Sequence, residues 1–261
     1  MTTLHKRYGW GSGQIIGLIA VAVTALVAYL LAERRAAEPI TPLHLFRSPV
    51  FSISAALFFL STLVLFAAML YVPLFMQEVH HYTAFEAGLF LIPLLAGLIG
   101  ATGISGSMIS RTGHYKIFPV IGAVLSGAGM AGFALSTSAP TWVLGLLLVV
   151  VGAGLGFFVQ VSVLAGQNAV DYRFLGVATG ALNFFKTLGG AFGAAIFGAI
   201  LTAELGGAAG RAQLAHSFAV LFGWTVPFMV IALLLALVMK EKPLSEEMID
   251  VASGKVDVAE Y

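Results

Sequence analysis

Lys186 stands out because it is the one charged residue deep inside any of the long apolar stretches of this sequence. A charge at the centre of a bilayer costs roughly 3 kcal/mol on insertion scales. A lysine at such a position is therefore a candidate for a functional role beside water or a ligand. Asn183 lies three residues earlier, near the edge of one helix face. We expect both to line a cavity. The alternative is that Lys186 snorkels to the headgroups, although about 18 Å of helix separates it from the predicted start of its stretch.

Aromatic and amide side chains near these positions are candidates for a lipophilic binding surface. Gln160 and Phe157 lie on the preceding apolar stretch, and Phe184 lies two residues before Lys186. Tolerant small-molecule sites are lined mostly by apolar and aromatic side chains with a few polar groups. The plainer interpretation is that these phenylalanines face lipid or fill contacts between helices.

Small residues recur every three or four positions on two of the stretches, which places them on one helix face. Such residues let the backbones of membrane helices approach closely, so they predict packing surfaces. The positions that carry this prediction are Gly152, Gly156, Gly190, Ala194 and Gly198. On the second stretch the same face continues backwards through Thr187, Asn183, Gly180 and Gly176.

The composition indicates that the solvent of this chain is largely lipid. Of its 261 residues 59% are hydrophobic and 10% are charged, which cannot cover a soluble domain with a polar surface. The continuously apolar runs exclude the alternating pattern of a membrane β-barrel. We therefore predict an all-α polytopic membrane protein. A net charge of +1 gives no indication of a nucleic-acid partner, and zero cysteines exclude disulfides and thiolate metal sites.

Seven transmembrane helices are predicted, at about residues 14–32, 50–76, 87–107, 117–137, 141–166, 174–203 and 218–239. Residues 1–13 then form an outer segment, 33–49 a cytoplasmic loop, 50–239 a six-helix bundle and 240–261 a cytoplasmic tail. Nine lysines and arginines gather on one side, whereas the other holds Lys6, Arg7 and Arg211. The positive-inside rule therefore places the C-terminus in the cytoplasm and the N-terminus outside. A signal peptide over the first 32 residues is disfavoured, because no small-residue cleavage site follows.

Two short segments between these helices carry further polar groups. The segment from Gly106 to Lys116, with Arg111 and Gly113, is predicted as a cytoplasmic loop that reverses tightly at a glycine. The cations of this segment can interact with the carbonyl groups at helix C-termini or with an acidic side chain. The alternative is that they merely follow the positive-inside rule. On the other side Glu78, His80 and His81 have metal-ligand chemistry, but we interpret them as an ordinary outer loop and predict no metal site.

Several motifs together resemble a known family. The spacing of Gly106, Arg111 and Gly113 resembles the second-half copy of the loop motif of the major facilitator superfamily. The stretches 45–49, 71–77, 86–93 and 180–193 are similar to the fourteen-helix drug:proton antiporter branch of that family. The resemblance covers nearly the whole chain. It implies that the first helix is a linker between transporter halves and that the following six are the C-terminal half.

The same resemblance sets the expected function. It implies one half of a proton-driven exporter of small lipophilic molecules in the bacterial inner membrane, with no cofactor, which needs an N-terminal half or a second copy as partner. The family commonly has arginine at the position of Lys186, which leaves any role of guanidinium geometry open. A non-transporting membrane scaffold or sensor is the alternative. An enzyme is disfavoured, because the histidines fall in loops, tails or helix ends.

Overall fold

The structure, a computed structural model, describes residues 43–170, 174–205 and 210–240, together with residues 17, 20, 21, 23, 24, 27, 28 and 31. The chain divides into two compact units, Met1–Leu43 and His44–Tyr261. Most of the predicted helix at 14–32 and nearly all of the predicted tail at 240–261 lie outside the described residues, as do Arg173 and Lys242. The following concerns the second unit.

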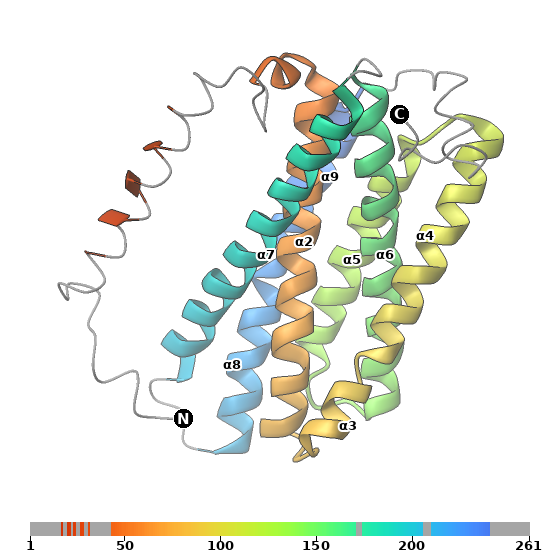
Figure 1. Cartoon of the computed structure of the whole chain (residues 1–261). Coiled ribbons are helices and arrows are strands. Elements are labelled where there is room, and N and C mark those ends of the chain that lie inside the picture. Colours follow the sequence, from red (N-terminus) through yellow and green to blue (C-terminus); the bar gives the residue numbers. More distant parts are fainter. Residues whose placement is uncertain are drawn as a thin grey trace. The chain divides into compact units, whose positions relative to one another are not determined.

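All regular structure in the described residues is helical, which confirms the predicted all-α class. In chain order the helices are η1 (Leu43–Arg47), α2 (Pro49–Glu78), α3 (Ala84–Leu89), α4 (Ile92–Thr112), α5 (Ile117–Leu135), α6 (Thr141–Asn168), α7 (Leu175–Leu205), α8 (Arg211–Gly223) and α9 (Thr225–Val238) (Figure 1). Taken as α2, α3 with α4, α5, α6, α7, and α8 with α9, they make six segments that are long and apolar enough to cross a membrane.

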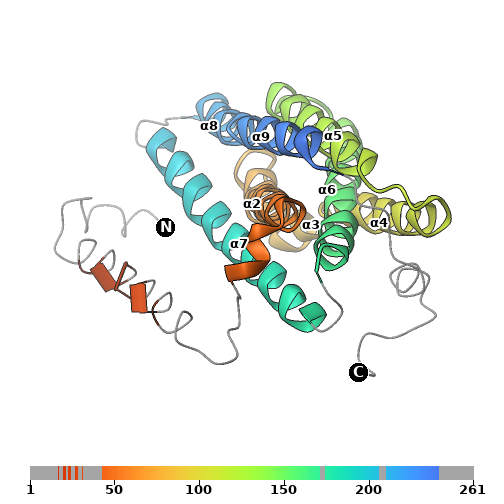
Figure 2. The same ribbon diagram turned by 90° about the horizontal axis from the view of Figure 1, so that it is seen from above.

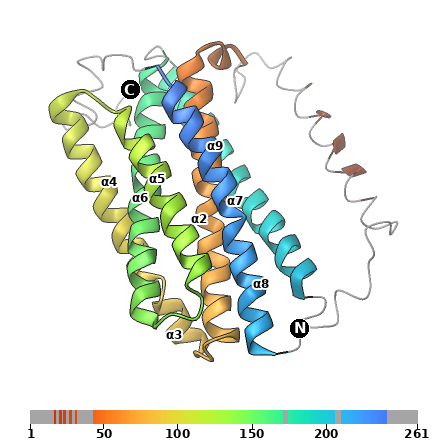
Figure 3. The ribbon, with the colours of Figure 1, turned by 180° about the vertical axis from the view of Figure 1, so that it is seen from behind.

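The six segments form a bundle with α2 and α6 at its centre. Helix α2 packs against α7, α6 and α9, and α6 packs against α4 and α5. Seen from above, α4 and α7 lie at opposite ends, and α5, α8 and α9 cover one side (Figure 2). The view from behind shows α5 and α9 side by side on that covered side (Figure 3).

Two of the six segments are broken, and each break lies just before a proline. Pro93 and Pro227 have no amide hydrogen to donate to the preceding turn, so the helix is interrupted at residues 90–91 and at Trp224. Helix α3 begins with a capping box, in which Thr83 accepts a hydrogen bond from the Glu86 amide and the Glu86 carboxylate accepts one from the Thr83 amide.

Two predicted boundaries were wrong. Helix α4 continues to Thr112, so Gly106 and Arg111 lie on a helix and the connection is reduced to residues 113–116. The polar side chains of this last turn hydrogen-bond their own backbone, as Ser110 does to the carbonyl of Ser107, and Gly113 then ends the helix with a left-handed φ of 72°. The last segment begins at Arg211 instead of residue 218.

Candidate functional site

Lys186 lies on α7 with an exposed side chain, and its ammonium approaches α2. Its Nζ is 5.8 Å from the centroid of the Phe58 ring, within the range of about 6 Å for a cation–π contact. Phe58 itself is buried and lies nine residues after the first residue of α2, or about 14 Å along the helix. The ammonium is therefore held over an aromatic face well inside the bundle's length instead of reaching for the helix end.

The face of α7 next to Lys186 is uncovered in its first half. A Cβ atom built on Gly176 or Gly180 would meet no neighbouring atom within 4 Å. Asn183 and Thr187 are exposed on the same face, and the Thr187 hydroxyl hydrogen-bonds the Asn183 carbonyl at 2.9 Å. The small residues predicted to pack in this part of the helix therefore meet no neighbour within the bundle, and they leave a shallow polar face beside the lysine.

Phe184 lies next to this face and belongs to a chain of aromatic rings. Its centroid is 5.7 Å from that of Phe185, which in turn lies 5.7 Å from Phe46 of η1. Phe184 is half-buried, whereas Phe58 below Lys186 is almost fully buried. Of these rings, that of Phe58 lies against the ammonium of Lys186.

The other predicted cavity residues, Gln160 and Phe157, lie elsewhere. The amide of Gln160 is the nearest group to Gly106 of α4, where a Cβ atom would lie 3.3 Å from Nε2. Phe157 turns toward α5, and its ring lies 5.6 Å from that of Phe118. The structure therefore places Asn183 beside Lys186 on the exposed side of α7 and packs Phe184 against Phe185, but it places Gln160 and Phe157 in the contacts of α6 with α4 and α5.

Gly152 and Gly156 lie where α6 meets α4. A Cβ atom on Gly152 would overlap the backbone carbonyl oxygen of Leu94, and one on Gly156 would overlap that of Leu98. The hydroxyl of Thr102 donates to the Gly156 carbonyl at 3.1 Å, so a side-chain hydrogen bond crosses the same contact. The two helices approach so closely because neither residue has a side chain.

Gly190, Ala194 and Gly198 lie where α7 meets α2. A Cβ atom on Gly190 would lie 2.8 Å from the ring of Phe66, and one on Gly198 would lie 2.7 Å from the hydroxyl of Tyr71. That hydroxyl donates a 2.7 Å hydrogen bond to the carbonyl of Ala194. Here aromatic side chains of α2 fill the space above small residues of α7.

We expect Tyr71→Phe to lower the stability of the bundle modestly. The change removes the hydrogen bond to Ala194 but keeps the ring, and single side-chain hydrogen bonds between membrane helices are worth about 0.6 kcal/mol on average. Thermal unfolding in detergent measures this loss. Tyr82→Phe, on the connection after α2, is the matched control and should leave the midpoint unchanged. Equal shifts for both variants would contradict the prediction.

The residues of the predicted cytoplasmic loop are spread over a helix end and a helix start. Arg111 is exposed in the last turn of α4, where a cation complements the helix dipole. Lys116 is half-buried and precedes α5, and Tyr115 between them is fully buried. Of the four predicted residues, Gly113 and Lys116 lie at the two ends of the connection, and Gly106 and Arg111 lie on α4.

The sequence reasoning missed three residues that position Lys186. Gly189 and Gly193 lie directly against α2, since a Cβ atom on either would overlap the carbonyl oxygen of Phe59 or Leu63. Their spacing of four was visible, but the neighbouring stripe through Gly190 obscured it. The third is Phe58, and no pattern in the sequence links it to a lysine 128 positions away.

The fold and this site define a class: a polytopic helical membrane protein with an exposed cation inside one of its spans. The chain belongs to the Major Facilitator Superfamily, whose family model matches residues 1–194. Members of this family are transporters, not enzymes, and they need no cofactor. The family that the motifs resemble is thereby confirmed.

Individual relatives agree with this assignment. The chain is 40% identical over 197 residues to the uncharacterised MFS-type transporter Rv1877 of Mycobacterium tuberculosis, covering 74% of this chain and 28% of that protein. It is 32% identical over 201 residues to the multidrug transporter protein MdtP of Bacillus subtilis, covering 77% and 37%. A tetracycline resistance determinant of Streptomyces rimosus is 32% identical over 200 residues, covering 76% and 58%. The chain thus spans less than two thirds of the length of each.

Proposed function

We propose that this chain is the C-terminal half of a proton-coupled exporter of small lipophilic molecules. It forms one wall of a central cavity and works by alternating access together with an N-terminal half or a second copy. The observation that carries the proposal is Lys186, an exposed cation inside a span, beside the uncovered polar face of α7. The names of MdtP and of the tetracycline resistance determinant support drug-like substrates.

The uncovered faces of the outer helices support a helical partner. In the most apolar stretches of the spans formed by α3 with α4 and by α7, 22% and 28% of residues are buried, against 61% in α2. Both helices carry glycines with open space around them, Gly100 and Gly103 on α4 and Gly176 and Gly180 on α7. Glycine faces favour close contact with another membrane helix, so we assign them to the partner half.

The positive charge of Lys186 affects which substrates the cavity accepts and where the proton-carrying groups lie. A lysine in the cavity disfavours cationic substrates unless an acid offsets it. In the described part of the chain Glu78, Glu86 and Glu204 are the acids, and all lie at or near helix ends. The proton-carrying carboxylates and the counter-charge to Lys186 are therefore assigned to the partner half.

The direction of insertion follows from the charges at the two ends of the bundle. We propose that the connection with Arg111 and Lys116 faces the cytoplasm of a bacterium and that the end with Arg211 faces outward across the inner membrane. By the same rule the C-terminus is cytoplasmic and the N-terminus lies outside.

We expect the 261-residue chain alone to be inactive in transport. Alternating access needs two bundles that rock against each other, and this chain supplies one. Inverted vesicles that contain the chain, with a pH gradient and a fluorescent lipophilic dye, should show no proton-dependent dye movement. Joining the chain to the part of a relative such as MdtP that this chain does not match should restore it.

Two outcomes would overturn parts of this proposal. Proton-dependent dye export by the chain in monomeric form would remove the need for a partner. Absence of transport in every joined form, despite correct insertion, would favour the alternative of a non-transporting scaffold or sensor.

A further inference from the structure

A pocket lies at the end of the bundle opposite the connection of Arg111 and Lys116. It has a volume of about 350 Å³, near the lower end of the roughly 300–1,000 Å³ typical of small-molecule sites. Its lining comes from three separate places: Val79 and His80 after α2, Thr137 and Ser138 between α5 and α6, and the first turns of α8. It therefore does not involve the candidate site on α7.

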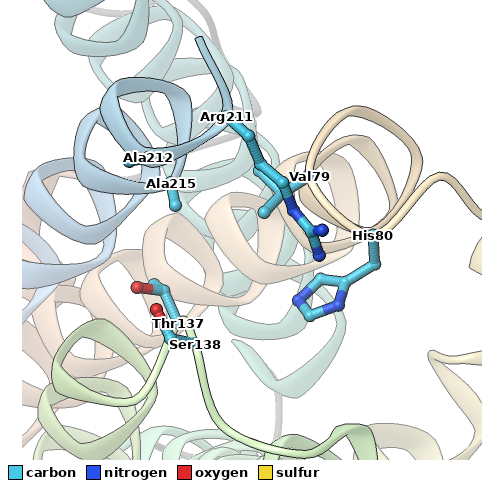
Figure 4. A pocket seen from close by; sticks show the side chains of 7 residues that line it. All are labelled: Val79, His80, Thr137, Ser138, Arg211, Ala212 and Ala215. Atoms are coloured by element: carbon cyan, nitrogen blue, oxygen red, sulfur yellow. The ribbon is translucent and has the colours of Figure 1, made fainter.

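The polar groups of this pocket face one another across it. Figure 4 shows the guanidinium of Arg211 beside the imidazole of His80, with the hydroxyl groups of Thr137 and Ser138 on the opposite wall. The His80 ring is positioned by edge contacts with Phe75, at 5.1 Å, and Tyr82, at 6.4 Å. Its Nε2 atom is buried and has no hydrogen-bond partner among the described residues. A buried polar atom without a partner is costly, and a ligand would satisfy it.

The charged side chain among the described residues that line this pocket is that of Arg211. Arg211 is always protonated, and no Asp or Glu occurs among the described residues that line the cavity. The residues that precede Arg211 in the chain, 206–209, are glycines and alanines and bring no carboxylate. A planar guanidinium next to an imidazole and two hydroxyls is the donor set that binds phosphate and carboxylate groups.

We propose that this pocket binds an oxyanion, either the phosphate of a lipid headgroup or a free anion, between Arg211 and His80. Arg211 supplies the permanent charge and the forked donors. His80 adds a second charged donor when it is protonated. The volume exceeds what a bare anion fills, so a phosphate with an attached polar group fits the space better. The proposal stands apart from export and is tested on the chain alone.

Binding and proton uptake are linked through His80. Burial lowers its pKa from the ordinary 6.5, a hydrogen bond with the backbone of Thr137 acts in the opposite direction, and the charges of Arg211 and His81 lower the pKa further. Thr137 and Ser138 on the facing connection are uncharged, and Tyr82 is the other titratable side chain in contact. A lowered pKa means that His80 is neutral in the empty pocket at neutral pH. A bound anion favours the protonated ring and raises that pKa, so affinity must increase as the pH falls.

The test measures ligand binding to the purified chain in detergent at constant ionic strength. The probes are sulfate, glycerophosphoglycerol and short-chain dihexanoyl phosphatidylglycerol, whose charges stay constant between about pH 5.5 and pH 7.5. We expect saturable stabilisation that strengthens as the pH falls. Arg211→Gln should weaken binding by roughly tenfold or more at every pH. His80→Gln should keep the binding seen at pH 7.5 and lose its increase at low pH.

Matched control variants and a second measurement distinguish binding in this pocket from binding elsewhere on the protein. Arg47→Gln and His216→Gln remove the same residue types from exposed positions outside the pocket and should bind as the unaltered chain does. The pKa of His80, followed by NMR in the unaltered chain, should rise on addition of a binding probe. Equal binding of all three probes supports a free anion, and binding of the lipid alone supports a headgroup. No binding, equal binding to Arg211→Gln, or an unchanged His80 pKa would overturn the proposal.

Discussion

Alanine at Gly152 is expected to lower the stability of the bundle by about 3 kcal/mol, the upper end of typical overpacking costs. Its Cβ atom would overlap the carbonyl oxygen of Leu94 and lie 2.8 Å from the Leu94 carbonyl carbon and 3.0 Å from the amide nitrogen of Leu98. All three are backbone atoms, so no side chain can turn aside. Helices α4 and α6 must separate, and the hydrogen bond from Thr102 to Gly156 is stretched with them.

The matched control for this prediction is Gly145→Ala on the same helix. There the nearest atom to a Cβ would be Cγ of Pro93 at 3.9 Å, an ordinary contact. Alanine is favoured over glycine in helices by about 1 kcal/mol, so this variant should be neutral or more stable. Thermal unfolding in detergent compares the two. A Gly152→Ala midpoint equal to that of the control would show that the helices do not approach as described.

Gln in place of Lys186 is expected to reduce export roughly tenfold or more, or about 1.4 kcal/mol, once the chain is joined to an N-terminal half. The change removes the cation that, in the proposed function, meets a carboxylate of the partner half. Insertion should be unaffected, because the side chain is exposed and a neutral amide is less costly in a membrane. Dye efflux from cells and the amount of transporter in the membrane are the two readouts.

Three further variants test whether the loss of export comes from the charge of Lys186, from its contact with Phe58, or from the removal of any exposed lysine. Lys186→Arg keeps the charge and should retain most of the export. Phe58→Leu keeps a bulky apolar side chain but removes the aromatic face under the ammonium, so it should give an intermediate loss. Lys240→Gln changes an exposed lysine beyond α9 and should have no effect. Normal efflux by Lys186→Gln at equal expression would exclude the cavity role.

Much of the fold was predictable because its periodicity and hydropathy are local. The apolar runs locate all six described spans, and the capping box that starts α3 has its two side chains, Thr83 and Glu86, only three residues apart. The errors lie where polar residues continue a helix. Ser107, Ser110 and Thr112 end the apolar run, but their hydroxyls donate hydrogen bonds to carbonyls of their own helix, and α4 continues to Thr112.

The candidate site was predictable only in part. Lys186 was found because a lone charge in an apolar run can be recognised from the sequence itself, and its neighbour Asn183 follows from helical spacing. Gln160 and Phe157 were grouped with it because polar and aromatic residues on a neighbouring span could face the same way. The rotation of α6 about its axis places them otherwise: Gln160, on the side of Gly156, lies against α4, and Phe157 packs on Phe118 of α5.

The sequence by itself determined the class of this protein, its spans and the position of the one charge deep within a span, because lipid solvation acts on each helix separately. Tertiary structure alone decided which face of each helix is covered. It brought Phe58 under Lys186, left Gly176 and Gly180 open, and joined His80 to Arg211 across 131 positions of sequence. These depend on the rotation of each helix about its axis, and that rotation is fixed by the packing of all neighbours together, not by any segment alone.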